Sequence, residues 1–337
     1  MIEPLLNGLL PERVRTCGRF ESRPQVVDPL EAFAGVERRL RRLRLKEWIG
    51  FTLIHPDLNC SLVMQDAHYL ASSEIYTFDR RRDHLHEHAS NARGGSPTLP
   101  RELFGSQCVY ARPGYEVVYA FGAERGTHRI SLDIAATRRG PAMHGELTLD
   151  GTGAPPPLSV SSRLPGGAIY THKRLYPASG SIRVGDSEFV FNPARDLAIL
   201  DEHRSFLPYQ TRWLWGTFAH IGLDGPVGAN FISRARGAAE PEESCIWAPH
   251  AAEPIDDVSF APQSADPLSP WRVWSADGRL DVIFEPDGRK NVKHQLLIAA
   301  IDYFQLFGRY TGTLRSAERT HTLRGVHGVC ECMLARL

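Results

Sequence analysis

The 337-residue sequence has no long uninterrupted apolar stretch. Its longest apolar run, residues 296 to 301, is far shorter than the roughly 20 residues that a membrane-spanning helix needs. The N-terminal segment MIEPLLNGLLPERVR is interrupted by two prolines and by charges, unlike the apolar core of a secretion signal. We therefore expect a soluble protein with no integral membrane segment.

Excess charge of one sign is also absent. The sequence has 39 basic and 39 acidic residues, so its formal net charge is zero, and only four of the basic residues are lysines. A protein without a global electrostatic field is not drawn as a whole to polyanions. The composition therefore argues against a nucleic-acid partner.

Cysteines are few and lack a regular spacing. The six stand at positions 17, 60, 108, 245, 330 and 332, which is no disulfide framework. Cys330 and Cys332 form a C-x-C, whereas zinc and redox sites use C-x-x-C. Reduced thiols in the cytoplasm are the expected state, and no metal is expected at these positions.

One histidine cluster could imitate a metal site. His84, His86 and His88 in HLHEH would share one face of a strand. The preceding DRRRD and the following SNARGGSP instead favour a polar, histidine-rich loop. We therefore predict a loop here, without a metal.

The sequence lacks the common cofactor and hydrolase motifs. It contains no G-x-G-x-x-G after an expected strand, no Walker loop, no H-E-x-x-H and no G-x-S-x-G. We therefore expect no cofactor.

One amphipathic helix is expected, over residues 31 to 44. Leu30, Phe33, Val36, Leu40 and Leu43 recur at spacings of three and four, and arginines fill most of the positions between them. The arginine run is either a solvated face or a surface for an anion or a partner. Residues 1 to 29, without a sustained period, are expected to form an extended arm.

The rest of the chain alternates in short runs separated by Gly, Pro and Asp. This rhythm is typical of antiparallel barrels or sandwiches. We predict an all-β fold of two consecutive β domains with few short helices. The Gly- and Pro-rich segment from Gly151 to Gly167 is the clearest change of composition. It places the predicted boundary between domains of residues 1–155 and 156–337.

The stretch from Asp196 to Thr217 combines charges and aromatics most densely. In an extended backbone, Tyr209, Trp213 and Trp215 share one face. Asp201 and His203, just upstream, supply a carboxyl group and an imidazole. Acid and base groups beside an aromatic wall suit a pocket for an apolar ligand or an interface anchor.

A carboxylate also interrupts the apolar face of the expected strand from Leu45 to Leu53. Glu47 is either paired with an arginine in the core or a polar group in a ligand cavity. As a general acid we rank Asp201 first and Glu47 second, with His203 as a candidate base. Alternatively, an ion pair of Asp201 with Arg204 fixes the chain and lowers the carboxyl pKa.

Several motifs resemble the family known as domain of unknown function 2804. They are RLKEW at 44–48, YTHKRLYPASGSIRVGDSEFVFNP at 170–193, LDEHRSFLPYQTRWLWG at 200–216, SPWRVWSADGRLDVIFEP at 269–286, FGRYTGTL at 307–314 and the terminal GVCECMLARL. The family is similar to two-domain, lipocalin-like β proteins that include carotenoid hydratases, other hydratases and natural-product cyclases. The resemblance implies two β-barrel-like domains that hold an apolar ligand.

These motifs and the aromatic stretch supply the candidate substrate-binding residues, which are Lys46, Trp48, Tyr170, Lys173, Arg204, Tyr209, Trp213, Trp215, Trp271 and Glu331. The leading hypothesis is a cofactor-independent hydratase, isomerase or cyclase for a hydrophobic, unsaturated small molecule. The alternative is a non-catalytic carrier of a lipid-like ligand, because fold alone does not separate the two. The sequence does not give the oligomeric state.

Overall fold

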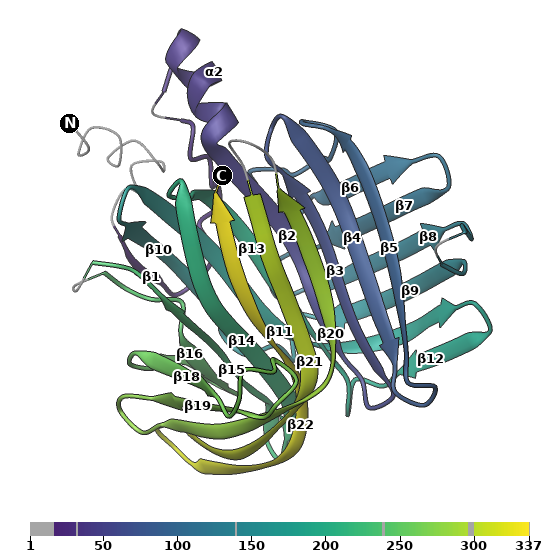
Figure 1. The fold of residues 1–337 in the computed structure, drawn as a ribbon, viewed down its shortest axis with the longest axis vertical. Helices are drawn as coiled ribbons and strands as arrows, with labels where there is room; N and C mark the ends of the chain where they lie inside the picture. Colours follow the sequence, from purple (N-terminus) through teal and green to yellow (C-terminus); the bar gives the residue numbers. More distant parts are fainter. Residues whose placement is uncertain (1–16, 32, 139, 238–239, 296–299, 337) are drawn as a thin grey trace.

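Two curled antiparallel β-sheets build the protein in the computed structural model (Figure 1). One sheet is a nearly closed barrel and the other a half-barrel. The structure describes residues 17–31, 33–138, 140–237, 240–295 and 300–336. The predicted all-β class is confirmed.

The first sheet has 13 strands in the path β5-β4-β3-β2-β13-β11-β9-β8-β7-β6, with β1, β10 and β12 off this path. In chain order the strands are β1 (Gly18–Phe20), β2 (Leu45–Ile54), β3 (Leu58–Asp66), β4 (Leu70–Asp79), β5 (His84–Arg93), β6 (Gln107–Arg112), β7 (Tyr115–Phe121), β8 (Thr127–Ile134), β9 (Met143–Asp150), β10 (Leu158–Leu164), β11 (Gly167–Val184), β12 (Ser187–Phe191) and β13 (Leu197–Phe206).

The second sheet has nine strands in the order β17-β16-β15-β14-β22-β21-β20-β19-β18. In chain order they are β14 (Gln210–Gly222), β15 (Gly225–Arg234), β16 (Cys245–Ala248), β17 (Ala251–Pro254), β18 (Val258–Pro262), β19 (Trp271–Ser275), β20 (Leu280–Gln295), β21 (Ala300–Arg315) and β22 (Thr320–Arg336).

Burial shows which strands are covered on both sides. Along β9, buried and exposed residues alternate strictly, as expected for a strand with one face on a core and one in solvent. Along β2 nearly every residue is buried. The second sheet therefore packs against the outer face of the first sheet near β2, and the strands there have no solvent face.

Each sheet encloses its own apolar core. Residues such as Phe51, Tyr119 and Leu147 fill the barrel, while Phe218, Phe284 and Tyr310 fill the half-barrel. Smaller apolar clusters join the sheets, including one that combines Leu175 and Ile199 of the first sheet with Ala219 and Trp247 of the second. The joint between the sheets is thus partly dry and apolar.

Strand β11 changes partners along its length. Its first part pairs with β10 and β13, and its last part with β9 and β12. Within the later part, Gly180 has a φ of 114°, and a Cβ there would lie 2.1 Å from the carbonyl oxygen of Glu146. Only glycine fits this bend, which accounts for the glycine of the PASG motif.

The predicted helix is present as α2 (Gly35–Arg44), which starts four residues later than expected. None of its ten residues is buried. In the described part of the chain, no helix is long and apolar enough to cross a membrane. Of the predicted N-terminal arm, residues 1–16 lie outside the described residues, and β1 pairs with β10.

Two local predictions need correction. The HLHEH segment is a strand and not a loop. It belongs to β5, whose ten residues all pair with β4. Part of the segment from Gly151 to Gly167 is also a strand, because β10 pairs with β1 and β11. The domain boundary between 155 and 156 stays a prediction. It falls inside the first sheet, and the chain enters the second sheet between Phe206 and Gln210.

The barrel interior holds two neutral histidines. His172 is fully buried, and within the described residues neither of its ring nitrogens has a hydrogen-bond partner, nor does Nε2 of His128. Burial lowers the pKa of His172 to about 3 and that of His128 to about 4. Protonation of either ring is thus coupled to unfolding.

We expect acid to destabilise the fold through these histidines. Each group has a folded pKa below its unfolded value of about 6.5, so its stabilising effect is complete above that value and is lost as pH falls. For His172 alone, the free energy of unfolding should fall by about 2 kcal/mol between pH 7 and pH 5. His172→Leu should flatten this dependence in urea titrations. The exposed His250→Leu should not, and equal slopes for all three proteins would contradict the assignment.

Candidate active site

A cavity of about 360 Å³ lies between the facing surfaces of the two sheets. Strands β2, β3, β4, β11 and β13 line it from the first sheet, and β14, β15, β20, β21 and β22 from the second. Its volume falls within the usual range for small-molecule sites. The candidate site is therefore built jointly by both sheets.

Strand register places four predicted residues on one wall. His203 stands opposite Trp48, and Lys173 stands opposite Asp201, which in turn faces Gly50. Directly opposed residues of an antiparallel pair project to the same side of a sheet. All four side chains belong to residues that line the cavity.

Lys173 is the centre of a buried ionic cluster on this wall. Its Nζ lies 3.1 Å from Asp201 Oδ1 and 3.3 Å from Glu243 Oε2. Arg234 adds a second cation, with Nη1 3.2 Å from Glu243 Oε1. Arg234 also pairs with Glu242, with Nη2 2.6 Å from Oε1, so carboxylates hold both cations of the cluster.

His203 completes the cluster. Its Nε2 lies 2.9 Å from Asp201 Oδ1 and 2.9 Å from the Thr171 hydroxyl. Its ring stacks on Trp48, with centroids 4.3 Å apart and planes inclined by 21°. The indole and the hydrogen-bonding partners together hold the imidazole in one orientation.

The pKa of Asp201 reflects these neighbours. Burial alone would raise it, but Lys173 and His203 outweigh burial and lower the pKa of Asp201 below its usual value. The pKa of Lys173 is correspondingly raised, since Asp201 and Glu243 outweigh its burial. Asp201 is therefore an ionised carboxylate at neutral pH. Its ion-pair partner is Lys173, and not Arg204 as the sequence suggested.

Glu331 lies on the opposite wall in a different environment. Trp213 Nε1 donates to its Oε1 at 2.8 Å, and Tyr303 and Gln305 both donate to its Oε2 at 2.8 Å. Burial nevertheless raises the pKa of Glu331, because no cation pairs with it in the described residues. Gln305 in turn accepts a hydrogen bond from Tyr76 of the first sheet.

Aromatic rings connect the two walls. Trp215 stands directly opposite Glu331 in the β14 and β22 register, and its ring lies 4.5 Å from Lys173 Nζ. Trp213 carries the hydrogen bond to Glu331, and Trp48 lies on the facing wall. The predicted tryptophans of β2 and β14 thus all line the cavity.

Other predicted residues lie elsewhere. Tyr170 and Arg204 oppose each other on the inner face of the barrel and are absent from the cavity lining. Trp271 is in the half-barrel core, where Nε1 donates to the Pro267 carbonyl at 2.9 Å. Tyr209 precedes β14 and is 46% exposed.

Glu47 contributes to the lining, but its carboxylate belongs to another cluster. Arg204 and Arg101 both donate to Oε1, and His68 Nε2 lies 2.8 Å from Oε2. Burial would raise the pKa of Glu47, yet these neighbours lower it to about 2. Among the two sequence interpretations, the structure favours the arginine-paired one.

Lys46 lies at the edge of the cavity. Its Nζ donates to the carbonyls of Leu43 at 3.0 Å and Arg44 at 3.3 Å, at the end of α2. These carbonyls have no partner within the helix, so the lysine caps it. Burial lowers the pKa of Lys46 to about 8.

Sequence reasoning missed Glu243, Arg234, Tyr303 and Gln305. Glu243 lies in the connection before β16, where no periodicity marks it. Ile301, Tyr303 and Gln305 occupy every second position of β21, a pattern that indicates a shared face. This pattern could have identified the β21 wall, but not the contact of that wall with Glu331.

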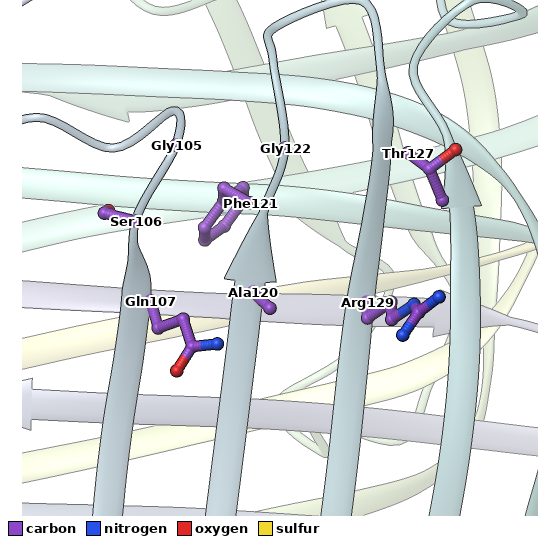
Figure 2. Close-up of a pocket in the computed structure, with 8 residues that line it drawn as sticks. All are labelled: Gly105, Ser106, Gln107, Ala120, Phe121, Gly122, Thr127 and Arg129. Atoms are coloured by element: carbon purple, nitrogen blue, oxygen red, sulfur yellow. The ribbon is translucent and has the colours of Figure 1, made fainter.

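A second pocket lies at the ends of β6, β7 and β8 (Figure 2). Its lining consists of Gly105, Ser106, Gln107, Ala120, Phe121, Gly122, Thr127 and Arg129. Arg129 is its one charged side chain, and it is exposed. Because no acid and base converge here, we place the candidate site in the cavity between the sheets.

We expect Asp201→Asn to lower the free energy of unfolding by about 1–3 kcal/mol at pH 7, since a charge-assisted contact to Lys173 is lost. Asp201 has a depressed folded pKa, so its contribution exists above about pH 4 and disappears as pH falls further. Urea titrations at pH 7 and pH 3 should show the deficit shrinking. Asp133→Asn, in an exposed pair with His144, is the control, and equal stability of Asp201→Asn and wild type at pH 7 would contradict the pairing.

Comparison with known proteins gives a family and a fold. Residues 29–337 match the family described as domain of unknown function DUF2804. No curated protein matches the sequence. A crystal structure of CghA with Sch210972 is 12% identical over 87% of this chain and 88% of that one, with a TM-score of 0.53. Kievitone hydratase from Nectria haematococca is 11% identical over 86% and 88%, with a TM-score of 0.47. The family match covers nearly the whole chain, in agreement with the motifs, and this protein belongs to the DUF2804 family.

Proposed function

We propose that this protein is a cofactor-independent hydratase, isomerase or cyclase that transfers protons to and from a hydrophobic, unsaturated small molecule. The observation that carries the proposal is Glu331, a carboxyl group with a raised pKa in an aromatic cavity opposite an ionic cluster. The proposal rests on this chain's own residues, because one fold supports many functions.

Glu331 takes the role of general acid. Its raised pKa favours the protonated form of the carboxyl group, which can donate a proton to a double bond. Once the proton has left, the donors Trp213, Tyr303 and Gln305 stabilise the carboxylate. Asp201, the first choice from sequence, suits this role less, because Lys173 holds it ionised.

Aromatic rings suit the charge that then develops. Protonation of a carbon–carbon double bond leaves a carbocation, and an indole face stabilises a cation by roughly 0.5–2 kcal/mol. Trp48, Trp213 and Trp215 all line the cavity. Trp213 and Trp215 lie beside Glu331, and Trp48 lies on the facing wall, which supports this role.

The pair of Asp201 and His203 takes the role of base. The Asp201 side chain is 28% exposed, which leaves room for a hydrogen bond from water or a substrate hydroxyl in the cavity. In hydration, the water oxygen bonds to the cationic carbon and its proton passes to this pair. In isomerisation or cyclisation, the pair removes a proton from carbon instead.

The lining favours a neutral, mostly apolar substrate. Lys173 and Arg234 are already paired with Asp201, Glu242 and Glu243. An additional charged group on the ligand would therefore lack a counterion within this cluster. The chain's six cysteines are free thiols, which fits the proposed cytoplasmic location.

The test is conversion of an apolar extract of the host in D₂O, followed by mass spectrometry. Wild type should bind a ligand and convert it, gaining one D₂O in hydration or one carbon-bound deuterium in isomerisation or cyclisation. Glu331→Gln should keep binding within about tenfold and lose at least 100-fold in rate, since an amide is not a competent acid.

Glu188→Gln, on an exposed side chain outside the cavity, should behave as wild type. A ligand that binds and is released unchanged, without deuterium, would support the carrier alternative. Equal rates for wild type and Glu331→Gln would remove Glu331 from the mechanism.

The pH profile provides a second test. Tyr303→Phe removes one hydrogen bond that lowers the pKa of Glu331, so the pKa should rise further. A general acid works below its pKa, so the alkaline limb of the rate profile should move to higher pH. Tyr209→Phe, outside the cavity lining, should leave the profile unchanged. A lower rate with an unshifted limb would indicate a structural role for Tyr303.

A further inference from the structure

Helix α2 exposes its apolar side. Val36, Leu40 and Leu43 are 72%, 62% and 49% exposed, although their spacing of four and three residues makes a continuous stripe. An amphipathic helix in a soluble protein normally turns such a stripe toward the core. In Figure 1, α2 extends beyond the ends of the strands.

The opposite side of α2 holds it on the protein. Arg38 Nη2 lies 2.9 Å from Asp28 Oδ2, Arg42 Nε donates to His68 Nδ1 at 3.2 Å, and the Arg41 guanidinium lies 4.9 Å from the Phe33 ring centre. At 3.6 residues per turn, these three arginines lie roughly opposite the apolar stripe. The helix is thus attached by its basic side, with its apolar side turned outward.

Two further arginines flank the stripe. Arg39 and Arg44 fall on either side of it by the same helical geometry and both are exposed, although Arg44 also donates to the Leu207 carbonyl at 3.0 Å. With five arginines and one glutamate, α2 has a net charge of +4 in ten residues. Two copies of this surface would repel each other, which favours an anionic partner over a second copy.

Exposed apolar side chains also lie at the edge of the cavity. Tyr69 and Leu70 are 54% and 51% exposed, and both line the cavity between the sheets. They are connected to α2 through Lys46, whose Nζ caps the helix and lies 5.1 Å from the Tyr69 ring centre. The C-terminal end of α2 is therefore beside the edge of the candidate active site.

We propose that α2 docks on the surface of an anionic lipid bilayer. Val36, Leu40 and Leu43 enter the boundary between headgroups and acyl chains, while Arg39 and Arg44 contact lipid phosphates. Docking places the cavity edge at the bilayer, where an apolar substrate is concentrated. This last link rests on the proposed function, whereas the docking itself does not.

Vesicle sedimentation of the full chain tests the proposal without a substrate. Wild type should bind vesicles with 30% phosphatidylserine in phosphatidylcholine. It should bind vesicles of pure phosphatidylcholine much more weakly. Leu40→Asp should weaken binding at least tenfold. Leu223→Asp, at a 93% exposed leucine between β14 and β15, is the matched control and should bind as wild type.

Charge is tested separately. Arg39→Glu with Arg44→Glu should weaken binding at least 25-fold, because each basic residue near such a surface contributes about fivefold. The exposed pair Arg112→Glu with Arg129→Glu should have little effect. Glu331→Gln should bind vesicles as wild type does, which separates this proposal from the proposed reaction.

Three results would overturn the proposal. The first is an absence of wild-type binding to anionic vesicles, and the second is unchanged binding by Leu40→Asp. The third is a wild-type dimer in analytical ultracentrifugation that Leu40→Asp converts to a monomer, because the stripe would then pack on a second copy.

Discussion

A buried ammonium group must be neutralised where it lies, and this constraint organises the space between the two sheets. Lys173 is 1% exposed, and its charge is held by Asp201 of the same sheet and by Glu243 of the segment that leads into β16. His203 and Arg234 bind to the same carboxylates. The position of one sheet against the other thus depends on charge balance as well as on apolar contacts.

Asp201 and Glu331, two of the carboxyl groups that line the cavity, differ because only Asp201 is in ion-pair contact with cationic partners among the described residues. Asp201 and Glu331 are both removed from bulk solvent, and burial acts on both in the same direction. Lys173 reverses the effect at Asp201, whereas Glu331 has only neutral hydrogen-bond donors. A pair of carboxyl groups with opposite protonation preferences is a common basis of acid and base catalysis.

Periodicity predicted the face of a strand but not its neighbours. The alternation of Trp213 and Trp215 correctly indicated one shared face, and both line the cavity. Asp201 and Glu47 were ranked first and second as general acids for one cavity, because nothing in the sequence gives the register of β2 against β13. That register pairs Asp201 with Gly50 and Glu47 with Arg204, so their side chains leave opposite faces of the sheet.

Contacts between distant segments could not be predicted from the sequence for the same reason, because the pairing of strands is not encoded locally. Tyr303 and Gln305 meet Glu331 only because β21 pairs with β22, and composition near Gly151 does not reveal that β9 and β10 join one sheet. Tyr209 was expected with the tryptophans, but β14 begins one residue later. Only the resemblance to the family pointed to Glu331, because no local pattern marks it.

The alternation of faces along β11 and β13 has a consequence for how this protein can diversify. One face serves the barrel core and the other faces the second sheet, so Lys173, Asp201 and His203 can be exchanged without removing a side chain of the barrel core. Five strands of the second sheet line the cavity, and that sheet has a core of its own. A lineage can therefore accumulate new ligand specificities on an inherited barrel core, as long as the substitutions keep the charges of the cavity wall in balance.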